Sequence, residues 1–261
     1  MKLILLIFFI SIPILSHDYF IYERTNTPIY FSVSEYTFPN SWQTRSISPK
    51  GESLKKEEQR RSKNVLIKAL DKYPASVIKK NLKAIYVLGH LEFYGQLFGG
   101  TNSNDIVYLT NKGITKGYTD FYLEQTFHHE FSSIFLRNFP KLFNKTKWKD
   151  LNAKGFKYGK GGVKALKEGK TGQVFYKEVN KKGLLTEYSK SSLENDLNTF
   201  AQNIFLPNKN FAQVLKKHKK LRKKREFLIN FYNKIDKRFT KKFFDNIMWP
   251  KKKLKTKKSI K

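Results

Sequence analysis

The residues with the clearest chemical potential lie in the segment Thr126-Phe-His-His-Glu-Phe-Ser-Ser133. In the pattern H-E-x-x-H, two histidines one helical turn apart bind one zinc ion, and the glutamate acts as general base. His129 and Glu130 supply the first two positions here, but Ser133 stands where the second histidine belongs. Because a neutral hydroxyl is a poor zinc ligand, this exchange should weaken metal binding by several kcal/mol.

Three other groups could supply the missing ligand. His128 is adjacent to His129 but lies about 100° around the helix, so both rings could reach one ion only with distortion. His90 follows a predicted strand and could approach from the sheet. A water molecule could also complete a weak site. The spacing does not choose among these three, and Ser133 itself stays a candidate ligand.

A role without any metal is also open for this segment. His128, His129 and Glu130 could form a polar patch on an amphipathic helix, with Glu130 paired with a nearby lysine or histidine. In that interpretation the three residues are part of a solvated or hydrogen-bonded surface and carry no chemistry.

The helix that carries the motif is predicted from Asp120, a good N-cap, to Asn138, with Pro140 behind it. At about 100° per residue its side chains divide into two faces. The apolar face holds Leu123, Phe127, Phe131, Ile134 and Phe135, and the mixed face holds Tyr122, Thr126, His129, Ser133 and Leu136. A mixed face of this kind is expected to line a cleft.

Hydrophobic periodicity and turn residues predict the elements around this helix. Before the motif helix we expect one or two strands in His17–Tyr36, a loop over Phe38–Glu52, and helices over Ser53–Tyr73 and Ala75–Asn81. A buried strand over Leu82–Leu88, a turn over Gly99–Asn104 and an edge-like strand over Asp105–Thr110 should follow. After the motif helix we expect a surface excursion over Leu151–Gly183, with a hairpin around Gln173–Val179, and a helix over Ser191–Leu206.

This order of elements resembles that of the zincin metallopeptidases, specifically the gluzincin branch, in which a distant glutamate is the third metal ligand. It is also similar to a group of secreted zinc-binding metallopeptidases of Bacteroidetes-like bacteria, whose members carry a similar H-H-E-F helix. The resemblance covers roughly residues 53–206. It implies an α+β, zincin-like fold in which a small mixed sheet packs on the active-site helix, followed by a more helical C-terminal part.

The resemblance also implies roles for individual residues. His129 matches the first zinc ligand, Glu130 the general base, Glu194 the third ligand, and Tyr188 a tyrosine that donates a hydrogen bond to the oxyanion. The local sequence allows other roles for the last two. Ser191-x-x-Glu194 is a capping box that opens a helix, Asp196 is an alternative acid, and Tyr188 is one tyrosine among 14.

The N-terminal residues 1–16 are typical of a secretory signal, with Lys2 followed by an apolar run over Leu3–Leu15. This run is short for a membrane span, and an uncleaved anchor is the alternative. Export would place the protein in the periplasm, on the envelope or outside the cell. The chain has no cysteine, so disulfides are excluded and the folded state depends on its core. The zincin-like domain is predicted over residues 17–206.

The formal net charge is +31, and much of it lies at the C-terminal end. Between Asn208 and Lys261 there are 21 Lys and Arg against 3 Asp and Glu. We expect a basic helical region over residues 207–250 and a lysine-rich disordered tail over 251–261. Such a region is attracted to anionic envelope polymers or lipid headgroups, although a solvated lysine-rich surface is the simpler explanation. Export argues against a specific nucleic-acid partner.

Two functions follow from these observations. The first is an exported zinc-dependent peptidase, or a degenerate relative, acting on peptide or protein substrates. The second is a catalytically inactive, metallopeptidase-like binding protein of the envelope, whose cleft holds an extended peptide beside the strand over Asp105–Thr110. Its basic C-terminal region would contact anionic polymers.

Overall fold

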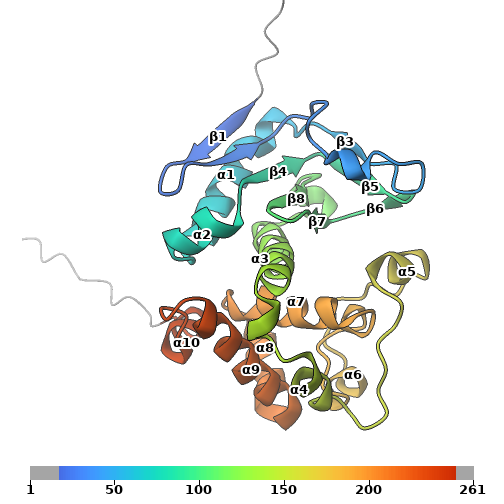
Figure 1. Ribbon diagram of the computed structural model, residues 1–261, viewed down its shortest axis with the longest axis vertical. Coiled ribbons are helices and arrows are strands. Elements are labelled where there is room, and N and C mark those ends of the chain that lie inside the picture. Colours follow the sequence, from blue (N-terminus) through green and yellow to red (C-terminus); the bar gives the residue numbers. More distant parts are fainter. Residues whose placement is uncertain (1–17, 251–261) are drawn as a thin grey trace, which may run out of the picture.

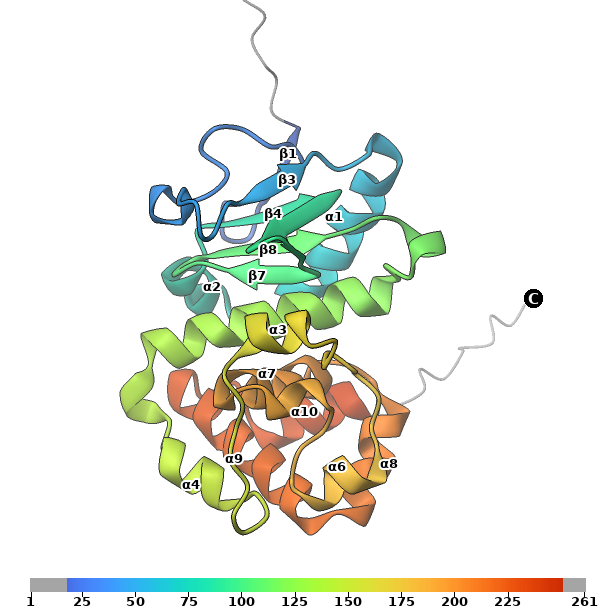
Figure 2. The same ribbon diagram turned by 90° about the vertical axis from the view of Figure 1, so that its right-hand side faces the viewer.

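The computed structural model describes residues 18–250, so the predicted signal over 1–16 and the tail over 251–261 lie outside the described residues. A β-rich half and a helical half lie on opposite sides of one long helix, α3 (Asp120–Asn138) (Figures 1 and 2). The predicted α+β class is therefore confirmed, with a small mixed sheet on the motif helix and a helical C-terminal part. In residues 18–250 no helix is both long and apolar enough to span a membrane.

The main sheet has five strands in the order β1-β2-β4-β8-β7. The strands β2, β4 and β8 are parallel, and β1 and β7 are antiparallel edge strands. A second antiparallel sheet has the order β3-β5-β6. The strands are β1 (Tyr19–Tyr22), β2 (Thr27–Tyr30), β3 (Lys50–Glu52), β4 (Ala84–Leu88), β5 (His90–Phe93), β6 (Gln96–Leu97), β7 (Gly100–Asn102) and β8 (Ile106–Thr110).

The edge of the main sheet differs from the sequence-based prediction. The segment Gly99–Asn104, predicted as a turn, contains strand β7, which is the true edge. Strand β8, predicted to be edge-like, lies between β4 and β7. Paired glycines favour turns in a sequence pattern, but here they allow a short strand to approach a helix closely.

The helices before and including α3 match their predicted positions well. They are α1 (Lys56–Asp71), α2 (Ala75–Asn81) and α3, and the apolar face predicted for α3 is buried in the main core. The N-cap of α3 is Thr119, not Asp120, because the Thr119 side chain accepts a hydrogen bond from the Tyr122 amide at 3.2 Å.

The rest of the described chain is helical. The excursion over Leu151–Gly183 contains two short helices and no hairpin, so that prediction is wrong. The helices are α4 (Lys145–Asp150), α5 (Gly162–Lys167), α6 (Lys177–Lys181), α7 (Leu193–Ile204), α8 (Lys209–Lys217), α9 (Lys219–Ile235) and α10 (Lys241–Met248). Single 3-10 turns lie at Asn40–Trp42, Ile114–Lys116, Pro140–Leu142 and Tyr188–Lys190.

A buried ion pair ties the helical half together. Asp196 on α7 and Lys224 on α9 have fully buried side chains, and Lys224 Nζ lies 2.5 Å from Asp196 Oδ2. Trp148 Nε1 and the Tyr158 hydroxyl donate to the same oxygen at 2.8 and 2.5 Å. Asp196, the alternative acid of the sequence analysis, is therefore committed to this network.

We expect Lys224→Met to lower the free energy of unfolding by about 3–5 kcal/mol, because it leaves the Asp196 carboxylate buried without its charge partner. Urea denaturation measures the loss. The matched control is Lys223→Met, which alters the neighbouring exposed lysine and should change stability by less than about 0.5 kcal/mol. Equal losses in the two variants would contradict the importance of the pair.

Candidate functional site

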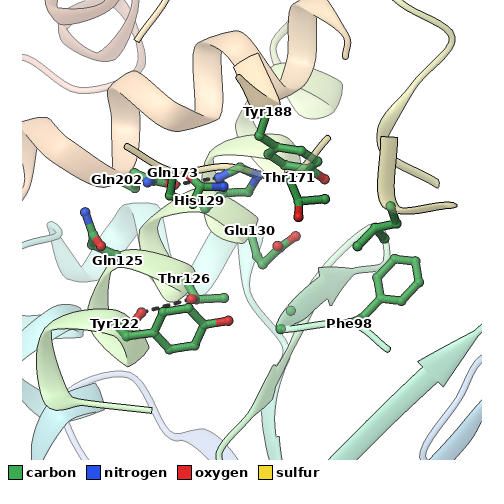
Figure 3. A pocket seen from close by; sticks show the side chains of 13 residues that line it. Phe98, Tyr122, Gln125, Thr126, His129, Glu130, Thr171, Gln173, Tyr188 and Gln202 are labelled. Carbon is green, nitrogen blue, oxygen red and sulfur yellow. Dashed lines mark hydrogen bonds between the residues drawn. The ribbon is translucent and has the colours of Figure 1, made fainter. Parts of the chain in front are cut away.

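A cavity of about 360 Å³ lies between the edge strand, the motif helix and the excursion. Figure 3 shows how its lining side chains converge. They come from the β6–β7 connection, from α3, from the excursion, from the turn over Tyr188–Lys190 and from α7. The lining residues are Phe98, Gly99, Gly100, Tyr122, Gln125, Thr126, His129, Glu130, Leu166, Thr171, Gln173, Tyr188 and Gln202.

His129 is held in the cavity by a residue of α7. Its Nδ1 atom lies 2.8 Å from Gln202 Oε1, and its ring stacks on Tyr188 with the centroids 6.1 Å apart. Because an amide oxygen only accepts, Nδ1 is the donor in this bond. A metal-binding histidine is oriented by the same kind of second bond. This bond fixes the His129 ring inside the cavity.

Glu130 has a buried carboxylate at the base of the cavity. Its Oε2 atom accepts a hydrogen bond of 2.5 Å from Asn102 Nδ2 on β7. Burial raises the pKa of Glu130, while the His129 ring and the Asn102 amide act in the opposite direction. Residues 18–250 offer no hydrogen-bond donor to Oε1, the second carboxylate oxygen.

Asn102 also connects Glu130 to the other acidic residue singled out in the sequence. Its Oδ1 atom accepts from Arg137 on α3, and Arg137 donates as well to the Ser103 carbonyl at 2.6 Å and to Glu194 at 3.3 Å. The Glu194 side chain is about two-fifths exposed and does not line the cavity. Glu194 thus lies at the outer end of a series of hydrogen bonds that runs from Glu130 through Asn102 and Arg137.

The capping role considered for this region belongs to another residue. Ser192 is the N-cap of α7, and its side chain accepts from the Asn195 amide at 3.0 Å. The capping box of Ser191 with Glu194 is therefore wrong by one residue, because Ser191 donates instead to the Tyr188 carbonyl.

Ser133 is buried next to the cavity and does not line it. It is 2% exposed, and its hydroxyl accepts a hydrogen bond of 2.6 Å from Asn198 Nδ2 on α7. The helices α3 and α7 are antiparallel, so His129 with Gln202 and Ser133 with Asn198 form two successive rungs between them. We call these two hydrogen-bonded pairs the α3–α7 rungs.

The remaining candidates lie apart from His129. His128 faces the core, where its Nδ1 shares a hydrogen bond of 2.8 Å with the Tyr73 hydroxyl and its ring stacks on Phe205. His90 belongs to the second sheet and lies beside Glu92. Tyr188 does line the cavity, and burial raises the pKa of its hydroxyl, which therefore remains a hydrogen-bond donor.

These positions do not fit a catalytic zinc ion. Such an ion needs three protein ligands and one open position. In the part of the chain that the structure describes, no three histidine, cysteine, aspartate or glutamate side chains are placed to share one ion. At the second ligand position, the Ser133 hydroxyl is engaged with Asn198, whose own Oδ1 is buried without a protein partner. We therefore derive no reaction step through a metal.

Several residues of the site were not found from the sequence. Asn198 and Gln202 are four residues apart on the buried side of α7, as His129 and Ser133 are on α3. Polar residues at this spacing along one helix face were the available signal. Asn102 gave no signal, because its role depends on a strand that reads as a turn.

Two glycines let strand β7 lie directly on helix α3. A Cβ atom added at Gly99 would lie 2.0 Å from the Tyr122 hydroxyl oxygen. A Cβ atom added at Gly100 would lie 2.6 Å from Thr126 Cγ2 and 3.1 Å from Glu130 Oε1. A side chain at either position would collide with α3, so the two glycines allow this close approach.

Comparison with known proteins gives one similar fold. No protein-family model and no curated protein sequence matches the chain. A crystal structure from Bacteroides caccae, titled a "putative zinc-binding metallo-peptidase", is similar to this chain with a TM-score of 0.49 and 16% sequence identity. The similarity covers 72% of this chain and 74% of the other. The proposals below rest on the geometry of the site itself.

Substitution of Gly99 tests the contact between β7 and α3. We expect Gly99→Ala to lower the free energy of unfolding by about 1–3 kcal/mol, because the Tyr122 hydroxyl must move out of a packed position. Most of this loss should be recovered in Gly99→Ala/Tyr122→Phe. Urea denaturation gives both values. Gly172→Ala is the control, since its Cβ would meet only Glu187 Cβ at 3.6 Å. Equal losses with and without the Tyr122 hydroxyl would refute the proposed contact.

The burial of His128 should make stability depend on pH. Burial lowers the pKa of His128 from 6.5 to about 4. The unfolded chain therefore binds the proton first, and stability present above pH 6.5 is lost as the pH falls toward 4. The loss is about 3 kcal/mol for this shift. In His128→Gln the pH dependence of the free energy of unfolding over this range should be smaller by that amount. An unchanged slope in the variant would contradict it.

Proposed function

We propose that this is an exported protein that binds an extended peptide segment along the free edge of β7, beside α3, and that it does so without metal-dependent hydrolysis. The observation that carries the proposal is the pair of α3–α7 rungs. In one of them, the Asn198 amide engages the Ser133 hydroxyl at the position where a zinc peptidase needs a second imidazole. In the other, Gln202 orients the His129 ring.

The free edge of β7 supports the peptide-binding part of the proposal. The Thr110 amide donates to the Gly99 carbonyl, and the Ser103 amide donates to the Ile106 carbonyl, both at 2.9 Å. Backbone groups alternate between the two edges of an antiparallel strand. Gly100 and Asn102 therefore direct their N–H and C=O groups away from β8, and no strand among residues 18–250 pairs with that edge.

The size and chemistry of the cavity also support a short peptide ligand. Its volume of about 360 Å³ lies near the lower limit of ligand sites, which range over roughly 300–1,000 Å³. The walls carry amide and hydroxyl groups from Gln125, Gln173, Gln202, Thr126 and Thr171. Main-chain bonds to a strand edge would give affinity, and the cavity would select a side chain, as in other cases of β-strand addition.

The proposal is tested on protein that begins at residue 17. We expect much less than one zinc per chain by metal analysis, no cleavage of casein, and no change of melting temperature on adding a chelator. Fluorescently labelled unstructured peptides should bind equally well with and without chelator. Gly100→Val should weaken binding at least tenfold, because its side chain would collide with Thr126 and Glu130 and displace the edge strand.

A different set of results would contradict the proposal. One equivalent of zinc per chain that is lost in His129→Ala but kept in His218→Ala, together with casein cleavage lost in Glu130→Gln, would establish a zinc peptidase. His218 is the matched control because it lies between α8 and α9, outside the cavity.

A further inference from the structure

The geometry points to a specific ligand group for this cleft. We infer that Glu130 binds an ammonium group of the bound peptide, supplied by a lysine side chain or by the peptide N-terminus. This inference rests on the proposed function, because it assigns Glu130 to recognition and not to general-base chemistry on a metal-bound water.

Glu130 is the only acidic side chain among the thirteen residues that line the cavity, and none of the thirteen is Lys or Arg. Glu130 is a buried residue, with only 8% of its surface exposed. A buried charge is stable only when it is paired or fully hydrogen-bonded. Because Asn102 satisfies one oxygen alone, a cationic ligand group would supply what the carboxylate lacks.

The strand register brings a ligand side chain to this carboxylate. Residues directly opposite each other in an antiparallel pair place their side chains on the same face of the sheet. The Cβ direction of Gly100 points at Thr126 and Glu130. A peptide residue paired with Gly100 would therefore project its side chain on the face of β7 that meets Thr126 and Glu130.

The occupied oxygen also selects the kind of cation. A guanidinium group binds a carboxylate best through two parallel bonds to both oxygens. Glu130 Oε2 already accepts from Asn102 at 2.5 Å, so a guanidinium group bound to both oxygens would have to share Oε2 with that amide. An ammonium group binds as a compact point charge and needs only one oxygen. Lysine should therefore bind better than arginine.

The high net positive charge of the protein does not oppose this contact at short range. Exposed charges are screened over about 8 Å at physiological ionic strength. The nearest cation on α3, Arg137, is engaged with Asn102, the Ser103 carbonyl and Glu194. Arg137 is therefore already paired, and Glu130 carries the only carboxylate that lines the cavity.

The test uses acetylated and amidated peptides that differ at one central residue, which is lysine, arginine, norleucine or glutamate. Fluorescence anisotropy gives each Kd. We expect the lysine peptide to bind at least tenfold more tightly than the norleucine peptide and more tightly than the arginine peptide. In Glu130→Gln this lysine preference should fall to within twofold, while Glu187→Gln, which removes a charge outside the cavity, should keep it.

The same peptides distinguish a lysine side chain from a peptide N-terminus as the source of the ammonium group. They also distinguish failure of this inference from failure of the proposed function. If a norleucine peptide with a free N-terminus gains affinity over its acetylated form, and the gain disappears in Glu130→Gln, the N-terminus is the source. Equal binding of acetylated lysine, acetylated norleucine and free N-terminal norleucine peptides to the natural protein would overturn the inference, as would a preference that survives in Glu130→Gln. Failure of every peptide, norleucine included, to bind the natural protein would instead overturn the proposed function.

Discussion

Helix α3 lies between the sheet and the helical half of the molecule, and 11 of its 19 residues are buried. Its buried polar side chains therefore need hydrogen-bond partners within the protein. A buried polar group that lacks a partner is costly. This constraint explains the interior of the site. The hydroxyl of Ser133 and the ring of His129 take partners from α7, while Glu130 takes its partner from β7. The packing of both halves on α3 then depends on these few bonds.

The same constraint explains why a serine suits position 133, where the H-E-x-x-H pattern has its second histidine. An imidazole without a metal would be a large group to satisfy in a buried position between two helices. A serine hydroxyl is smaller and is satisfied by one amide, that of Asn198. The amides of Asn198 and Gln202 thus stabilise the contact between α3 and α7 through side-chain hydrogen bonds, where a metal centre would do so through coordination.

The sequence predicted the parts of the fold that have strong local signals. The bounds of α2 and α3 were predicted correctly, because periodic apolar residues and nearby prolines define them. Strand β7 was missed, because three residues that begin with glycine give no strand pattern. In the site, the sequence singled out His129, Glu130 and Tyr188, which all line the cavity. It did not single out Asn102, Asn198 or Gln202, since their roles depend on contacts between distant elements.

The two walls of the cleft differ in how firmly contacts with the rest of the protein hold them, and this should affect the rate at which a bound segment dissociates. One wall is α3 with β7, both held in the core. The other wall is the excursion, which is fixed near its ends by the Tyr158 bond to Asp196 and by the bonds of the Asn180 side chain to the carbonyls of Leu184 and Leu185. Further along, it is held by backbone hydrogen bonds to the turn before α7, at Gly159, Gly161 and Gly172. Between these points it carries few buried residues. The residence time of a bound segment should therefore depend on how often this wall moves aside, since affinity differences are expressed mainly in dissociation rates.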